Sequence, residues 1–150
     1  MGNTYTQIYI HIVFAVQEHL PRLRKELKNE VQQYITGIIK NRNQQLLAIN
    51  VMPDHVHILI RQKPDITISN LVRDIKSVSS KFINEQQWLK GRFRWQEGYS
   101  AFSYSQSQIE RIKNYIMNQE THHRNKTFTE ELVEILNKFR VSYDKQYLFK

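Results

Sequence analysis

The segment 52–60, Met-Pro-Asp-His-Val-His-Ile-Leu-Ile, carries two histidines two positions apart in a predicted strand. Side chains along a strand point alternately to the two faces of the sheet, so His55 and His57 point to one face and Val56 to the other. Neutral imidazole is the commonest metal ligand in proteins, and a strand holds two rings at a fixed separation. The spacing alone is more typical of two partly exposed strand residues, so a metal site needs support from a second element.

That second element is the segment 107–119, which has the pattern of an amphipathic helix. Ser107 and Glu110 form a potential capping box, and isoleucines at positions 109, 112 and 116 make an apolar stripe. At about 100° per residue, Tyr115 and Gln119 lie one turn apart on the flank of that stripe. A hydroxyl nucleophile and an amide oxygen are therefore expected at the border between core and surface. Taken alone, the pattern is more typical of a core-edge tyrosine and a solvated glutamine.

Together these residues resemble the single-tyrosine transposases of the HUH superfamily, which the smallest bacterial insertion sequences and their repeat-associated domesticated relatives encode. The motif histidine, hydrophobic residue, histidine is matched by His55-Val56-His57. The family's tyrosine, four residues before a metal-binding glutamine, is matched by Tyr115 and Gln119. The stretches 95–103 and 115–123 extend the likeness, which covers nearly the whole chain.

The resemblance implies that His55, His57 and Gln119 hold a divalent ion, either Mg²⁺ or Mn²⁺, and that Tyr115 is the nucleophile. A tyrosine hydroxyl ordinarily titrates near pH 10, so it attacks poorly at neutral pH unless the phosphate is polarised or the proton is removed. The implied products are a 5′-phosphotyrosine link and a free 3′-hydroxyl. The implied substrate is single-stranded DNA with hairpins at the ends of a mobile element.

Two other functions stay open at this stage. One is a domesticated or inactive protein that binds hairpins in repeat DNA without transposition. The other is a replication-initiating or conjugative nuclease of the same superfamily, although these are usually embedded in longer chains. His122 and His123 are interpreted as cations near a helix C-terminus rather than as ligands. Asp54 is interpreted as a turn residue rather than as a partner that orients a histidine.

The chain is basic, with 22 Lys and Arg against 14 Asp and Glu, a net charge of +8 and a pI of about 9.7. Such an excess attracts a polyanion, and nucleic acid is the natural candidate. Cations alternate with aromatic residues in the segment 90–99, a pattern typical of single-strand binding, although an edge strand with solvated charges and buried rings explains it equally. The predicted contacts to DNA are Arg73, Lys76, Arg92 and Arg94 for the backbone, with Trp95 and Tyr99 for stacking.

Hydrophobic periodicity predicts an α+β fold. Strands are expected at 5–16, 47–51, 55–60 and near 102–104, and helices at 23–39, 71–83, 107–119 and 129–139. The first six elements run strand, helix, strand, strand, helix, strand, which is the ferredoxin-like split βαβ order. We therefore expect an antiparallel sheet with two helices on one face. The tyrosine helix should lie near the other face, with the final helix beside it.

Length and composition predict one domain over 1–150, with no disulfide because cysteine is absent. The sequence carries neither a signal peptide nor a membrane span, and we expect a cytoplasmic protein. The resemblance further implies a homodimer joined edge to edge through the sheets. In such a dimer the tyrosine helix of one subunit can complete the histidine pair of the other.

Overall fold

The computed structural model describes residues 2–122 and 125–148. Its centre is an antiparallel sheet of four strands in the order β2-β3-β1-β4, which confirms the predicted ferredoxin-like arrangement. The strands are β1 (Tyr9–Ala15), β2 (Gln45–Val51), β3 (His55–Arg61) and β4 (Ser100–Tyr104). The histidine strand β3 therefore lies inside the sheet, with β2 and β1 as its neighbours.

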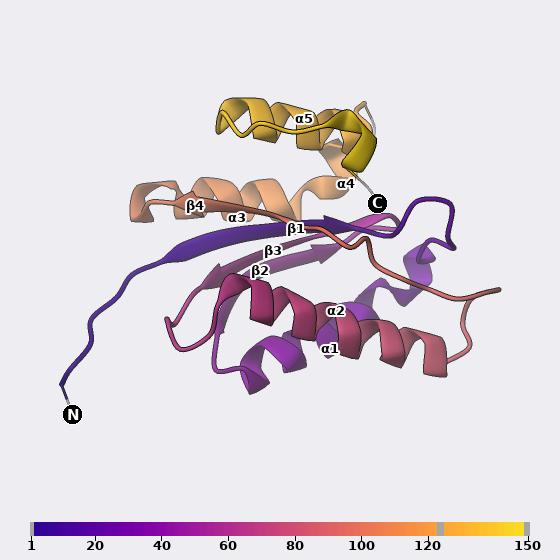
Figure 1. The fold of residues 1–150 in the computed structure, drawn as a ribbon, viewed down its shortest axis with the longest axis horizontal. Helices are drawn as coiled ribbons and strands as arrows, with labels where there is room; N and C mark the ends of the chain where they lie inside the picture. The colour runs from indigo at the N-terminus through magenta and orange to yellow at the C-terminus, as the bar shows by residue number, and fades with distance from the viewer. Residues whose placement is uncertain (1, 123–124, 149–150) are drawn as a thin grey trace.

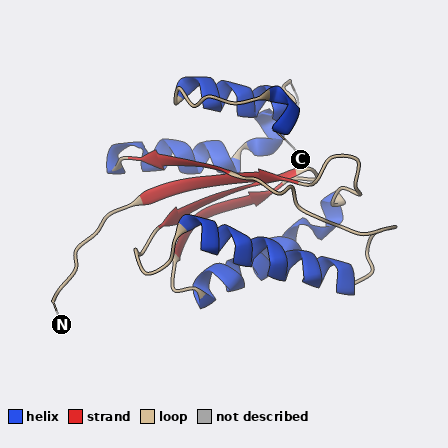
Figure 2. Cartoon of the chain, viewed as in Figure 1, coloured by secondary structure: helices blue, strands red, loops and turns tan. Residues whose placement is uncertain are grey.

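Helices cover both faces of the sheet (Figures 1 and 2). On one face lie α1 (Lys28–Asn41) and α2 (Ile68–Glu85), the two crossover helices. On the other lie α3 (Ile109–Met117), α4 (Gln119–His122) and α5 (Phe128–Lys138). Short 3₁₀ turns occupy Lys25–Leu27, Gln106–Gln108 and Lys145–Tyr147. The predicted position of the final helix beside the tyrosine helix is confirmed.

The alternation of β3 divides its side chains between two apolar layers. Val56, Ile58 and Ile60 pack into the larger core beneath α1 and α2, where all three are fully buried. Leu59 faces the opposite way and packs against the isoleucine stripe of α3. Because the histidines alternate with Val56 and Ile58, they belong to the layer under α3 and α5.

Strands β1 and β2 differ in detail from the expectation. β1 begins at Tyr9 rather than Tyr5, because its partners β3 and β4 end opposite Tyr9, at Arg61 and Tyr104. A bulge in β2 falls between Leu46 and Ala48. The extra residue there turns Leu47 toward α3, whereas unbroken alternation along the strand would place it with Ile49 and Val51.

β2 and β3 pair as an antiparallel hairpin. The backbone N–H of Met52 donates to the carbonyl oxygen of His55 at 2.8 Å and closes a tight turn over Pro53 and Asp54. Across the residues that the structure describes, no helix combines the length and the apolar character that a membrane crossing requires.

Candidate active site

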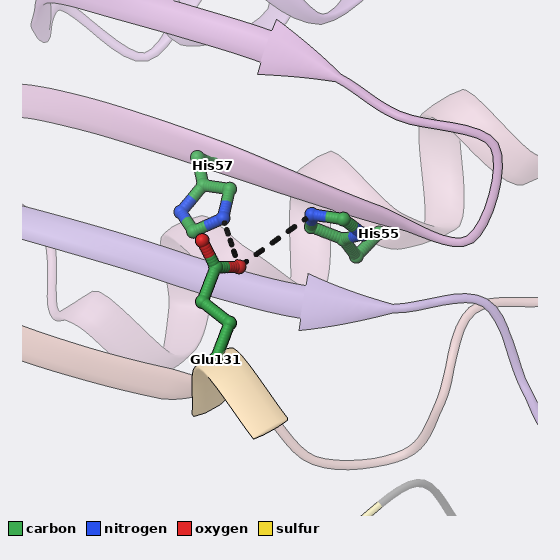
Figure 3. Close-up of side chains that lie close together, drawn as sticks. All are labelled: His55, His57 and Glu131. Atoms are coloured by element: carbon green, nitrogen blue, oxygen red, sulfur yellow. Dashed lines mark hydrogen bonds and ion pairs between the residues drawn. The ribbon is translucent and has the colours of Figure 1, made fainter. Parts of the chain in front are cut away.

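His55 and His57 are both buried, at 1% and 0% exposure, on the face of β3 that α3 and α5 cover. Both rings point toward Glu131, a carboxylate on α5 (Figure 3). The His57 Nε2 lies 3.1 Å from the Glu131 Oε1, and the His55 Nε2 lies 3.8 Å from the same oxygen. The strand thus brings the two imidazoles together at one point beneath a helix, as their spacing predicted.

The opposite nitrogen of each histidine has its own partner. The Nδ1 of His55 lies 2.7 Å from the Oδ1 of Asp54, and the Nδ1 of His57 lies 2.8 Å from the Nε2 of His11 on β1. Asp54 therefore does more than form the turn, the role the sequence favoured, because its carboxylate also orients a histidine. An imidazole whose Nδ1 donates outward carries its lone pair on Nε2. For His55, whose Nδ1 faces a carboxylate that can only accept, this directs the lone pair inward; for His57 the direction of the bond to His11 decides it.

The tyrosine element begins later than expected and is interrupted. Its capping box is formed by Ser105 and Gln108 instead of Ser107 and Glu110, and the regular helix starts at Ile109. A turn at Asn118 separates α3 from α4, so Gln119 opens a new helix. The predicted stripe of isoleucines is confirmed, since all three are buried against the sheet.

Tyr115 and Gln119 nevertheless reach the histidines within a single chain. Gln119 is fully buried, with its Oε1 3.3 Å from the His55 Nε2. The ring of Tyr115 lies edge-on to that of His57 at 5.9 Å between centroids. Asn50 of β2 holds the end of α3 in place, because its Nδ2 donates to the Ile116 carbonyl oxygen at 2.8 Å.

Glu131 is the site residue that the sequence analysis missed. It is 3% exposed, and its two oxygens face different partners. Oε1 faces the histidines, while Oε2 accepts hydrogen bonds from the Tyr115 hydroxyl and from the Gln119 Nε2, the latter at 3.0 Å. A carboxylate in the buried stripe of α5, three residues after Phe128, is the signal that would have identified it.

The same contacts set the charges of the site. Burial alone would raise the pKa of Glu131, but hydrogen bonds and charge from His57, with hydrogen bonds from Tyr115 and Gln119, lower it well below its ordinary value of 4.5. Burial and the neighbouring Glu131 carboxylate raise the pKa of Tyr115 above its ordinary value of 10. Burial also lowers the pKa of His11 well below 6.5, so that ring is neutral at pH 7. At neutral pH the site thus contains an ionised carboxylate and a protonated tyrosine.

The donor set suits a small divalent cation. The ligand atoms of His55, His57 and Glu131 all lie within 4.8 Å of one another, and the Gln119 Oε1 borders the same space. Ligand atoms around one cation, each about 2.0–2.2 Å from it, stand at most about 4.4 Å apart, so only small shifts are needed. When both Nδ1 atoms donate outward and a cation takes the place of the Nε2 hydrogens, two nitrogen lone pairs and two oxygens converge on one point. Such a set attracts a cation or a proton.

Replacing Glu131 by Gln is expected to change how stability depends on pH. Because folding lowers this pKa, the ionised carboxylate stabilises the protein above about pH 4.5, and that contribution is lost as pH falls below this value. In metal-free buffer, the free energy of unfolding from urea titrations should fall more steeply between pH 5 and pH 3 for the wild type than for E131Q. Glu110→Gln, which removes an exposed carboxylate on α3, should follow the wild type. Parallel curves for the wild type and E131Q would contradict this interpretation.

Most of the predicted DNA contacts gather at one cleft on the α2 side of the sheet. This cleft, which we call the α2 cleft, has a volume of about 330 Å³. Its lining includes Arg73, Lys76, Ser80, Arg94, Trp95 and Tyr99. Arg92 lines an adjoining depression that Arg94 also borders. The cleft thus combines two guanidinium groups with a partly exposed aromatic ring.

Three residues of this group have partners within the protein, one of them Arg73, which pairs with Asp74 at 3.3 Å. Trp95 is 3% exposed, its Nε1 donates to the Ser79 hydroxyl at 2.9 Å, and its ring packs edge-on against Phe14, so the face we expected to stack on a base is covered. The ammonium of Lys76 donates to three consecutive carbonyl oxygens of residues 96–98 at 2.5–3.1 Å. Lys76 therefore holds the loop that leads to Tyr99.

His122 ends α4, and His123 lies outside the described residues. The interpretation of these residues as cations near a helix end stays a prediction.

Comparison with known proteins agrees with this geometry. The model of the family described as "Transposase IS200 like" matches residues 4–119. The ISDra2 transposase TnpA of Deinococcus radiodurans is 25% identical over 125 residues, which cover 79% of this chain and 87% of that protein.

Two solved structures share the fold. One, from Deinococcus radiodurans R1 and provisionally called a transposase, has a TM-score of 0.60 and 24% identity, covering 79% of this chain and 96% of the other. The second is a REP-associated tyrosine transposase bound to a REP hairpin, with a TM-score of 0.59 and 16% identity over 82% of this chain and 73% of the other. Because the family model covers most of its length, the chain belongs to the IS200-like transposases, which are enzymes that cut and join DNA.

Proposed function

We propose that this transposase cleaves and rejoins single-stranded DNA at hairpin-bearing element ends, through a 5′-phosphotyrosine intermediate and with a divalent ion. The observation that carries the proposal is the convergence of a tyrosine hydroxyl, two imidazole nitrogens, a carboxylate and an amide oxygen in one buried cluster. A structural core would not gather so many polar groups at a sheet face.

Each residue has a role in this scheme. His55, His57 and Glu131 would hold the ion, and the Gln119 Oε1 would complete the set. When bound, Mg²⁺ or Mn²⁺ polarises the scissile phosphate and orients it for attack. Two nitrogen donors favour Mn²⁺ by softness, while abundance favours Mg²⁺.

The bond changes follow from the position of Tyr115. Its oxygen forms a bond to the phosphorus while the bond from phosphorus to the 3′ oxygen breaks. The phenol proton passes to the Glu131 Oε2, which already accepts its hydrogen bond, and the departing 3′ oxygen takes up a proton from water, to which Glu131 then releases its own. Attack by a second 3′-hydroxyl on the phosphotyrosine reverses these steps and rejoins DNA without ATP.

Two adjoining hollows could carry DNA from the α2 cleft to the site. A groove of about 1170 Å³ reaches His55 between the loop 17–22 and the start of α5. The backbone N–H of Gln17, in the wall of this groove, donates to the Arg94 carbonyl oxygen at 2.9 Å, so the groove and the cleft adjoin. We propose that the cleft binds the hairpin region and that the groove carries the strand to be cut. The relative solved with a REP hairpin supports a hairpin as ligand.

We also propose that residues 1–150 act as one domain and that the protein works as a homodimer. In the structure the tyrosine element contacts the histidines of its own chain, and a dimer with exchanged helices would use the same contacts between subunits. β4 is a short edge strand with Ala101 and Ser103 exposed, and edge strands can pair with a second chain.

The direct test is to trap the covalent intermediate. Single strands carrying the imperfect palindromes that flank the gene are incubated with the protein and Mn²⁺, then separated on a denaturing gel. A label at the 3′ end of the DNA should become attached to the protein, whereas a label at the 5′ end should leave on a shorter strand. Attachment of the 5′ label instead, or hairpin binding with no adduct, would overturn the proposed mechanism. The second result would favour a binding protein that has lost transposition.

A double variant of Arg73 and Arg94 tests the α2 cleft. Replacing both by Ala should weaken binding of hairpin-bearing single strands about tenfold or more at low salt, because each arginine releases counterions from the DNA. The slope of log K against log salt should become shallower by about 0.7 for each phosphate contact that is lost. Fluorescence anisotropy at several KCl concentrations measures both quantities. The control replaces Lys113 on α3 and Lys138 on α5 by Ala, which removes the same total charge and should change binding little. Equal effects of the two double variants would contradict the proposed position of the DNA at the α2 cleft.

A further inference from the structure

His11 is a further buried histidine, and it lies behind His57 as seen from the cluster. It lies on β1, is 0% exposed, and stacks on the ring of His57 at 5.0 Å with 19° between the planes. Phe102 and Tyr104 flank it, each at 6.1 Å between ring centroids. Its Nε2 lies 2.8 Å from the Nδ1 of His57, and its own Nδ1 is buried without a hydrogen-bond partner in the described part of the chain.

These surroundings would suit an apolar residue. A buried nitrogen that lacks a partner costs free energy, and aromatic rings on two sides offer it no acceptor. Among the described residues, the polar contact of this imidazole is thus its hydrogen bond to His57. Since that bond reaches a candidate metal ligand, its effect on His57 decides what His11 does.

The bond can exist in two forms. If the Nε2 of His11 donates, His57 carries its proton on Nε2, pointing at Glu131, and cannot bind a cation there. If the Nε2 of His11 accepts, His57 carries its proton on Nδ1 and offers the Nε2 lone pair to the site. Only the second form allows His57 to act as a ligand. In that form His11 keeps its own proton on Nδ1, the atom that faces the rings.

We propose that His11 is a positioning residue for the metal site: by accepting the Nδ1–H of His57, it selects the tautomer whose Nε2 lone pair faces the cation. The inference rests on the proposed function and adds a residue to it. Asp54 plays the same part for His55 from the other side of the cluster. Metal-binding histidines commonly depend on such an outer hydrogen-bond partner.

The chemical difference between the two outer partners follows from their surroundings. Asp54 lies in the turn with 34% of its side chain exposed, so water can solvate its charge. A carboxylate at position 11 would be fully buried between aromatic rings, where an unpaired charge is costly. A neutral imidazole accepts the same hydrogen bond without bringing a charge into that layer.

The test compares His11→Phe with His11→Gln. Phe keeps a ring that can stack on His57 but cannot accept a hydrogen bond, whereas the carbonyl oxygen of Gln can. Mn²⁺ affinity is measured without DNA, from the loss of the free Mn²⁺ signal in electron paramagnetic resonance. H11F should raise the dissociation constant about 10–100-fold, and H11Q should bind close to the wild type. Thermal unfolding of both variants checks that each is folded.

A second measurement reads the tautomer directly. In Mg²⁺-bound wild type, imidazole ¹⁵N chemical shifts should place the His57 proton on Nδ1 and leave the His11 Nε2 unprotonated. Mn²⁺ binding by H11F equal to the wild type, an equal loss in H11F and H11Q, or a His57 proton on Nε2 would overturn the role of His11 alone. A wild type that binds no Mn²⁺ would overturn the metal-dependent function and this inference together.

Discussion

Replacing Tyr115 by Phe is expected to abolish DNA cleavage and covalent attachment while leaving hairpin binding intact. The variant keeps the ring that packs beside His57 but removes the oxygen that attacks the phosphate. Loss of a nucleophile that acts together with its neighbours commonly lowers the rate on the order of 10³-fold or more. The rate of adduct formation with 3′-labelled single strands in Mn²⁺ measures the effect.

Tyr34→Phe is the matched control for this prediction. Tyr34 lies on α1, on the far side of the sheet, and stacks against Phe82, so removal of its hydroxyl should leave cleavage unchanged. Anisotropy with the same DNA should give equal binding for the wild type and both variants. Cleavage by Y115F at the rate of the wild type would show that another group attacks the phosphate.

Replacing His57 by Ala is expected to have the second large effect, on the metal itself. The residue supplies one of the nitrogen donors and carries the bonds to both His11 and Glu131. Because loss of an outer partner costs about 10–100-fold in affinity, loss of the ligand should weaken Mn²⁺ binding by about 100-fold or more. Cleavage should fall with it, and excess Mn²⁺ should restore part of the rate.

His19→Ala provides the comparison, since it removes an imidazole that is 88% exposed and lies outside the cluster. Its Mn²⁺ affinity should match that of the wild type. Thermal unfolding with and without Mn²⁺ completes the experiment, because a cation bound to the folded state raises the unfolding temperature. The added stability should be present in H19A and absent in H57A; equal stabilisation of both would place the metal elsewhere.

The sequence by itself determined the fold class and the candidate residues of the histidine and tyrosine motifs. Hydrophobic alternation placed His55 and His57 on one face of an inner strand, and helical periodicity placed Tyr115 beside a buried stripe. Local patterns suffice for these features because the side-chain periods of strands and helices depend on backbone geometry alone. Their order along the chain then indicated the split βαβ topology.

Contacts between distant segments were decided only by the tertiary structure. Glu131 and His11 reach His57 across 74 and 46 positions of sequence, and no local pattern specifies which strand neighbour or covering helix supplies such partners. The same reason explains the errors. Trp95 was expected to stack on a base, and its burial depends on what packs against it. Periodicity predicts which way a side chain points, but the assembled layers decide which group it meets there.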